Sequence, residues 1–215
     1  MLMWSLPLAV QFSLPVETNA RAHDVRTVFS ADDFPAYVQR AGINRFVSTR
    51  TTVRTEGTAQ DCVVEGGSGD PQLDAYTCAI IVRRAKFQPA KWTDGSPAYG
   101  VIRVPVSWVV GSASKGELEN ALPIDLDLFV IRLPTGAGRQ ANLRLMIVVD
   151  ERGRVAGCGE PSDASHSDGT KKFPELMPIA CEHLLKEFTA IPAKDATGKP
   201  VRSVQTAFVR FSVGS

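Results

Sequence analysis

Apolar and polar residues alternate in two separate runs in each half of the chain. Residues 46–55 and 143–150 are rich in β-branched and apolar residues, and residues 104–110 and 207–213 place an apolar side chain at every second position. Such patterns predict strands with at least one buried face. A glycine-containing turn follows the first run of each half, so we expect an antiparallel hairpin there.

A helical pattern lies between the hairpin and the last strand of each half. In the first half the positions at helical spacing are Leu73, Thr77, Ile80, Ile81 and Arg84. Asp70 is placed to cap this helix, and Pro71 suits its first turn, where a missing amide hydrogen is harmless. The second helix is expected through residues 184–188, but Pro178 lies inside its start and should kink or shorten it.

Landmark residues repeat along the chain in the same order as these elements. Gly57 and Cys62 are five residues apart, as are Gly153 and Cys158; Cys78 precedes Pro89-Ala90 by eleven residues, as Cys181 precedes Pro192-Ala193. The two cysteines of a half are sixteen residues apart in the first half and 23 in the second, which places an insertion, expected to be a polar loop, at residues 162–172. The sequence therefore predicts two tandem units, residues 32–110 and 123–215, joined by a linker at 111–122.

Charge and length exclude several classes of protein. The 215 residues are 44% apolar, and 24 Lys and Arg against 23 Asp and Glu give a net charge of +1. A chain with this balance has no overall field to attract nucleic acid or an anionic membrane, so neither is expected as a partner. No transmembrane helix is expected, because the uncharged run at residues 1–16 is too short and is interrupted by Pro7 and Pro15.

The first 22 residues have alternative interpretations. Residues 2–14 resemble the apolar region of a signal peptide, and Ala20-Arg21-Ala22 has the form of a cleavage site, but a basic start is missing. The segment is otherwise an apolar N-terminal strand, or follows a true start that lies upstream.

The four cysteines fall in equivalent places of the two units. This placement predicts the disulfides Cys62–Cys78 and Cys158–Cys181, each joining a strand to a helix, in an oxidising compartment. A zinc site is the competing interpretation, but the chain has no CxxC pair, and none of its three histidines repeats between the units. No metal or other cofactor is expected.

These residues resemble the C-terminal domain of TonB, the periplasmic energy transducer of Gram-negative bacteria. The first unit has Phe34-Pro35, Val64-Glu65-Gly66-Gly67-Ser68-Gly69, Leu73-Asp74, Lys86-Phe87-Gln88-Pro89-Ala90 and Gly95-Ser96-Pro97. The second unit keeps Gly153-Arg154-Val155, Ile191-Pro192-Ala193 and Gly198-Lys199-Pro200-Val201, and resembles a diverged copy.

The resemblance implies an α+β fold, with two tandem small antiparallel sheets and one helix packed on a face of each. It also implies a periplasmic binding module, not an enzyme, which accepts the TonB box of an outer-membrane receptor or a similar envelope protein as an added strand. The binding edges would be residues 99–109 and 202–213. The implied peptide-binding residues are Phe34, Pro35, Tyr99, Val101, Arg103, Pro105 and Ser107.

Two features depart from the family pattern. Pro105 cannot donate to a ladder, which favours an edge position and limits any added strand. The membrane helix and Pro-rich span that the family uses for energy transduction are missing from this sequence. The alternative to a soluble module is therefore the C-terminal part of a true transducer.

Residues 123–133 have no counterpart in the family unit. Ile124, Leu126, Leu128 and Val130 alternate with Asp125, Asp127, Phe129 and Ile131, which predicts a strand. We expect this strand to pair with an open edge of one unit, in the manner of a receptor strand, because two open edges would favour aggregation. The two aspartates are then interpreted as its solvated face, the alternative being a paired-carboxylate site.

The residues that could indicate an enzyme give a weaker signal than those that indicate a binding module. Residues 165–168 combine serine, histidine and aspartate, and would make a small hydrolase, but adjacent residues rarely form a triad. Residues 66–70 precede a helix as a phosphate loop would, yet they end in an acid and are interpreted as a turn and cap. No catalytic residue and no small-molecule substrate are therefore assigned.

Overall fold

The computed structural model describes residues 16–22, 28–41, 44–109, 123–164 and 168–214. The first half contains η1 (Ala31–Asp33), α2 (Ala36–Ala41), β3 (Arg45–Val53), β4 (Ala59–Gly66), α3 (Pro71–Arg84), β5 (Phe87–Gln88), β6 (Ala90–Trp92) and β7 (Pro97–Trp108). The second half contains β8 (Leu126–Val130), β9 (Gln140–Val149), β10 (Val155–Gly159), α5 (Gly169–Lys172), η2 (Pro174–Leu176), α6 (Met177–Glu187), β11 (Ala193–Lys194), β12 (Pro200–Val201) and β13 (Ser203–Val213). Two short strands, β1 (Val16–Thr18) and β2 (Arg21–Ala22), precede them. The linker predicted at residues 111–122 lies outside the described residues.

In the first half, the predicted hairpin and helix are both present. β3 pairs antiparallel with β4 on one side and with β7 on the other. α3 packs against β3 and β4. Its apolar stripe is buried, with Leu73 and Ile80 fully enclosed and Ile81 nearly so. The Asp70 carboxylate accepts hydrogen bonds from the amides of Gln72 and Leu73, which confirms the predicted cap.

The second half repeats this arrangement with two differences. β9 pairs antiparallel with β10 and β13, and α6 packs against β10. Pro178 lies in the first turn of α6, which begins at Met177 after a separate turn of 3-10 helix, so the predicted shortening is confirmed. The insertion, predicted as a loop, instead contains the short helix α5. The backbone at Gly169 passes so close to the carbonyl of Asn142 on β9 that a Cβ there would meet that oxygen.

The turn after the first strand has the same geometry in both halves. Gly57 and Gly153 have φ of 81° and 84°, in the left-handed region that favours glycine. A Cβ at Gly57 would lie 2.3 Å from the carbonyl oxygen of Phe87, and a Cβ at Gly153 the same distance from that of Ala190. The carbonyl of Gly57 also accepts a hydrogen bond from the amide of Phe87, and the carbonyl of Gly153 accepts one from the amide of Ala190. The glycines are therefore required twice over, by conformation and by space.

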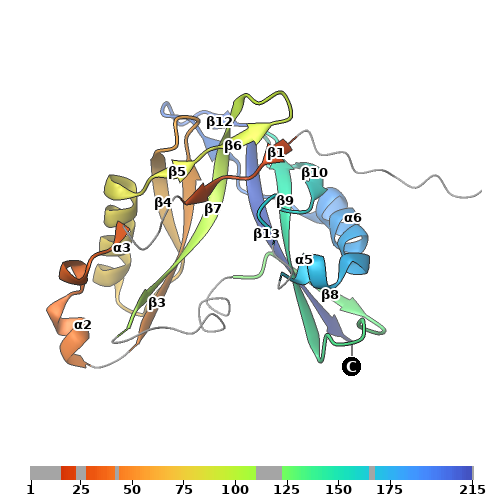
Figure 1. The fold of residues 1–215 in the computed structure, drawn as a ribbon, viewed down its shortest axis with the longest axis horizontal. Helices are drawn as coiled ribbons and strands as arrows, with labels where there is room; N and C mark the ends of the chain where they lie inside the picture. The colour runs from red at the N-terminus through yellow and green to blue at the C-terminus, as the bar shows by residue number, and fades with distance from the viewer. Residues whose placement is uncertain (1–15, 23–27, 42–43, 110–122, 165–167, 215) are drawn as a thin grey trace, which may run out of the picture.

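The two halves share one sheet, which corrects the expectation of two separate small sheets. Residues Tyr99, Gly100 and Val101 of β7 pair in parallel with Ser203, Val204 and Gln205 of β13. This ladder joins strands of both halves into a nine-stranded sheet. Figure 1 shows β7 and β13 side by side at their upper ends and diverging below, with α3 and α6 on the outer sides. The sequence pattern could not reveal this junction, because β7 and β13 each have the alternation expected of the last strand of a separate unit.

The predicted extra strand is found beside β13. β8 pairs in parallel with residues 209–213 of β13, below the point where β7 leaves that strand. The pairing expected for residues 123–133 is thus confirmed for Leu126–Val130. Since β9 occupies the opposite side of β13, both sides of this strand are paired along most of its length.

Part of the N-terminal segment, residues 16–22, belongs to the described fold. β1 pairs with β6 and β2 pairs with β5. Ala20 is 3% exposed, and a Cβ placed on Gly100 of β7 would lie 2.4 Å from its methyl carbon. Val16–Thr18 and Arg21–Ala22 therefore form strands, as in the alternative interpretation, while residues 1–15 lie outside the described part. No helix in the part of the chain that the structure describes is long and apolar enough to span a membrane.

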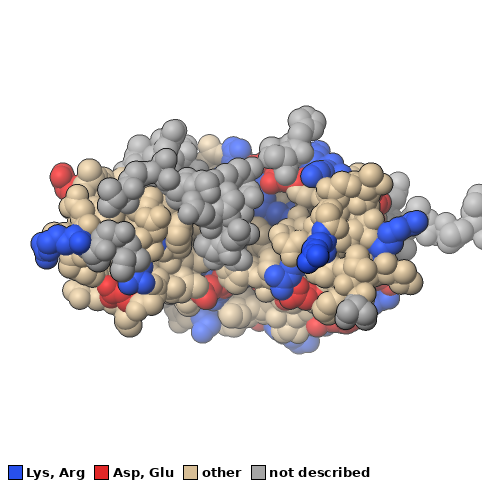
Figure 2. Space-filling view, turned by 90° about the horizontal axis from the view of Figure 1, so that it is seen from below, with Lys and Arg blue, Asp and Glu red and all other residues tan. Residues whose placement is uncertain are grey.

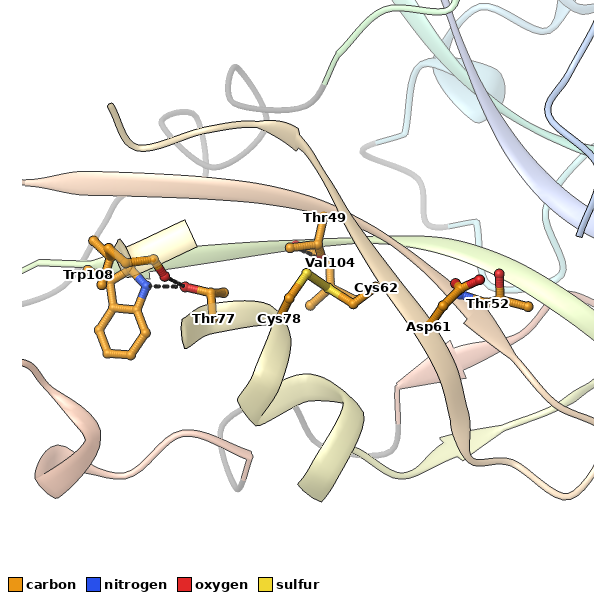
Figure 3. Close-up of a disulfide and its surroundings, with 9 residues drawn as sticks. Thr49, Thr52, Asp61, Cys62, Thr77, Cys78, Val104 and Trp108 are labelled. Carbon is orange, nitrogen blue, oxygen red and sulfur yellow. Dashed lines mark hydrogen bonds between the residues drawn. A yellow bond between two sulfur atoms is a disulfide. The ribbon is translucent and has the colours of Figure 1, made fainter. Parts of the chain in front are cut away.

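Each half contains one disulfide, as the cysteine spacing predicts. Cys62 on β4 is bonded to Cys78 on α3, and Cys158 on β10 is bonded to Cys181 on α6, with Cα–Cα distances of 5.4 and 5.5 Å. Figure 3 shows the first bridge between strand and helix. In the chain-entropy model each bridge stabilises its half by about 3 kcal/mol.

Candidate functional site

The candidate site is the side of β7 that faces away from β3. Residues 99–101 of this side pair with β13, but residues 102–108 have no partner strand there among the described residues. A strand edge of this kind presents unpaired amides and carbonyls to an incoming extended chain. We call residues 102–108 the free edge.

Alternation along β7 shows which backbone groups face outward. The Thr49 hydroxyl on β3 donates a hydrogen bond of 3.1 Å to the carbonyl of Val104, so this carbonyl points toward β3 (Figure 3). Backbone groups of successive strand residues point to opposite sides, so those of Arg103, Pro105 and Ser107 face the free edge. Pro105 has no N–H to donate, and its position opposite Ser48 is tolerated because its nitrogen faces away from β3.

A buried ionic cluster lies where the free edge begins. Arg103 forms ion pairs with Glu65 on β4 and Asp125 in the second half, and its side chain is 10% exposed. Burial lowers the pKa of Arg103, but the hydrogen bonds that Arg103 donates to Asp125 and Glu65 outweigh this effect and raise the pKa above its ordinary value. Arg50 lies 3.4 Å from Glu65. The cluster lines a cavity of about 200 Å³ beside the β7–β13 junction.

The position of Asp125 corrects one expectation. The alternating pattern placed Asp125 and Asp127 together on a solvated face. Asp127 is indeed exposed and pairs with Arg210, but the Asp125 side chain is only 13% exposed. It accepts a hydrogen bond from the amide of Phe208 in addition to its bonds with Arg103.

An aromatic cluster lies where β7 ends. The Trp108 indole N–H donates a hydrogen bond of 2.9 Å to the Thr77 hydroxyl on α3 (Figure 3). Its ring packs against those of Phe29, Phe34 and Tyr76, with centroids 5.5 to 6.0 Å apart. Trp108 is thus a core residue, as expected, and it holds the end of the free edge against α3.

The seven predicted peptide-binding residues therefore fall in three places. Tyr99 and Val101 lie in the ladder with β13, and Arg103 is bound by two carboxylates. Pro105 and Ser107 lie on the free edge. Phe34 and Pro35 line a groove beside α3, and the Phe34 ring also packs against Trp108 at the end of β7.

The described residues that had invited enzyme interpretations are engaged in structural contacts. Asp168 forms an ion pair of 3.0 Å with Arg144, and residues 165–167 lie outside the described part. Ser68 and Asp70 hydrogen-bond to the start of α3 and its loop, as a turn and cap would. No group of three or more metal-ligating side chains occurs among the residues whose positions are described. On the face seen in Figure 2, acidic and basic side chains are scattered among other residues without a large area of one sign.

The half of the chain that contains the free edge matches a known family. Residues 30–110 match the family model of the Gram-negative bacterial TonB protein C-terminal domain. The match begins at η1 and ends just after β7. This family is a non-enzymatic, transport-associated domain of the cell envelope. Together with the two disulfides, it indicates an extracytoplasmic location.

The TonB family match does not extend to residues 123–215, so the interpretation of the second half as a diverged copy stays a prediction. No curated protein and no solved structure matches the chain.

Proposed function

We propose that this protein is a periplasmic TonB-like module that binds an extended peptide by strand addition at the free edge of β7. The observation that carries the proposal is the seven-residue stretch, residues 102–108, whose outward side has no partner strand in the described structure. The TonB family match supports it, because the matched region ends with this strand. The partner would be a TonB-dependent outer-membrane receptor or a similar envelope protein.

The second half is a poorer acceptor than the first. β13 is paired with β9 on one side and with β7 and β8 on the other. A peptide could pair with β13 only after displacing one of these strands. Of β7 and β13, the last strands of the two halves, only β7 therefore has a free side for the proposed peptide.

The free edge limits the bound peptide. A peptide strand that extended from the free edge onto residues 99–101 would clash with β13, which pairs with them. The added strand therefore cannot exceed about seven residues. Since Pro105 offers no donor, the amide of Ser107 is the outward donor beyond it. The carbonyls of Arg103 and Pro105 still accept.

The test is a titration of the isotope-labelled protein with a synthetic peptide spanning the TonB box of a receptor from the same organism. The amide signals of Arg103, Val104, Val106 and Ser107 should shift, while those of residues 209–213 should not. Shifts confined to the second half, or no shift at millimolar peptide, would overturn the proposal.

A pair of variants at one position tests the backbone contact itself. Ser107→Pro removes the outward amide and should weaken peptide binding about fivefold, the equivalent of one net hydrogen bond. Ser107→Ala removes the same hydroxyl but keeps the amide, and should bind as the unchanged protein does. Equal affinities of the two variants would show that the peptide does not pair with this edge.

A further inference from the structure

A groove separate from the free edge lies between α3 and the segment formed by η1 and α2. Its volume is about 480 Å³. Figure 1 places α2 and α3 together at the outer end of the first half. The residues that define its chemistry are Asp32, Phe34, Pro35, Tyr37, Gln72 and Tyr76.

Both tyrosines of the groove donate their hydroxyl hydrogens to carboxylates. Tyr76 forms a long hydrogen bond of 3.5 Å to Asp33. A hydrogen bond between Tyr37 and Asp70 raises the pKa of Tyr37 and lowers that of Asp70. Both tyrosines line the groove, and the face of a tyrosine ring is electron-rich. Such faces attract cations.

The charge on the groove is negative. Asp33 is 6% exposed, and its carboxylate is balanced by an ion pair of 2.6 Å with Arg84. Asp32 is exposed and forms no ion pair with the residues described. One uncompensated carboxylate therefore lies beside aromatic rings, and Tyr37 keeps 40% of its surface exposed.

We propose that this groove binds an arginine side chain of a partner peptide. A guanidinium can stack on a tyrosine face and at the same time pair through two N–H groups with the Asp32 carboxylate, which a lysine ammonium cannot do. Phe34 and Pro35 add an apolar part to the groove, which suits proline residues on either side of the arginine. The site does not depend on strand addition at β7, although Phe34 and Tyr76 both contact Trp108 at the end of that strand.

The experiment compares two peptides that differ in one charge. The intact protein is titrated with acetyl-Pro-Arg-Pro-amide and with the citrulline peptide acetyl-Pro-Cit-Pro-amide, and the ring signals of Tyr37 and Tyr76 are followed by NMR. The arginine peptide should shift these signals and bind at least tenfold more tightly than its neutral isostere. Equal binding of the two peptides, or shifts that avoid both tyrosines, would overturn the proposal.

Variants at two exposed positions test separately the contact with the carboxylate and the contact with the aromatic ring. Asp32→Asn and Tyr37→Leu should each weaken binding of the arginine peptide at least threefold. The matched controls are Glu151→Gln, in an exposed turn, and Phe129→Leu, an aromatic residue that is 76% exposed, and neither should change the affinity. Unchanged binding to both groove variants would contradict the proposal.

Discussion

Arg103 of β7 and Asp125, the residue before β8, form a two-pronged ion pair between the halves of the chain. The two guanidinium nitrogens lie 2.6 Å from the two carboxylate oxygens. Asp125 is also held by the backbone of Phe208 on β13, through a hydrogen bond in each direction. The pair thus fixes the start of β8 at the point where β7 leaves β13, which leaves the free edge below it.

Loss of this pair should destabilise the protein. Asp125→Asn leaves the buried Arg103 with only Glu65 as an ionic partner, and we expect the free energy of unfolding to fall by roughly 3 kcal/mol. Urea denaturation followed by circular dichroism measures the change. Asp127→Asn, which breaks the exposed pair with Arg210 two residues away, is the control and should have little effect. Similar losses in both variants would show that burial does not distinguish the two pairs.

Removal of β8 should open the second half to peptide. Leu128→Pro places a residue without an amide hydrogen in the middle of β8 and should release the strand from residues 209–213 of β13. Hydrogen exchange of residues 126–130 should then be fast, whereas in the unchanged protein it should be slow. A receptor peptide should now shift signals of β13 as well as those of the free edge.

Leu128→Ala is the control for this prediction, because it trims the same side chain and keeps the backbone amide. Its exchange should stay slow and its second half should not bind peptide. Fast exchange of residues 126–130 in the unchanged protein would mean that β8 is not a stable strand.

Local signals in the sequence predicted much of this structure. The disulfides followed from the equal placement of four cysteines, and the cap at Asp70 from a short polar side chain directly before Pro71. The strand at β8 followed from an alternation of apolar and other residues. Each of these features depends on residues close in sequence or on a repeat that the sequence itself displays.

The junction of the two halves left no such signal. The pairing of β7 with β13 joins residues about a hundred positions apart, and backbone hydrogen bonds between strands do not depend on residue type. For the same reason, the alternation around Asp125 could not show that its carboxylate is buried against Arg103. The pairing of Arg103 with Asp125 is visible only once β7 and the start of β8 are placed side by side.

The repeated glycine turn makes a quantitative prediction. Gly57→Ala and Gly153→Ala should each lower the free energy of unfolding by at least about 2 kcal/mol, because alanine is strained at positive φ and its Cβ would meet a carbonyl oxygen. Gly198→Ala shares the positive φ of 85°, but nothing lies within 4 Å of the added Cβ. It should cost about 1 kcal/mol, from the backbone conformation alone. Thermal denaturation of the three variants would test this order.

Acid should weaken the contact between Asp33 and Arg84. The hydrogen bond from Arg84 holds the pKa of Asp33 well below its ordinary range, with help from the backbone amide of Ser30. A carboxylate whose pKa is lowered by folding stabilises the protein fully above the pKa of the unfolded chain, about 4. This stabilisation is lost progressively as the pH falls from there toward the folded value, because the unfolded chain takes up the proton first.

The free energy of unfolding, measured by urea denaturation between pH 6 and pH 2, should therefore fall less steeply in Asp33→Asn than in the unchanged protein. Arg84→Gln should flatten the curve in the same window, since it removes the main cause of the lowered pKa. The carboxyl carbon signal of Asp33 gives a direct check and should show an ionised group at pH 3. Titration of that signal near pH 4 would mean that the ion pair does not stabilise the folded chain.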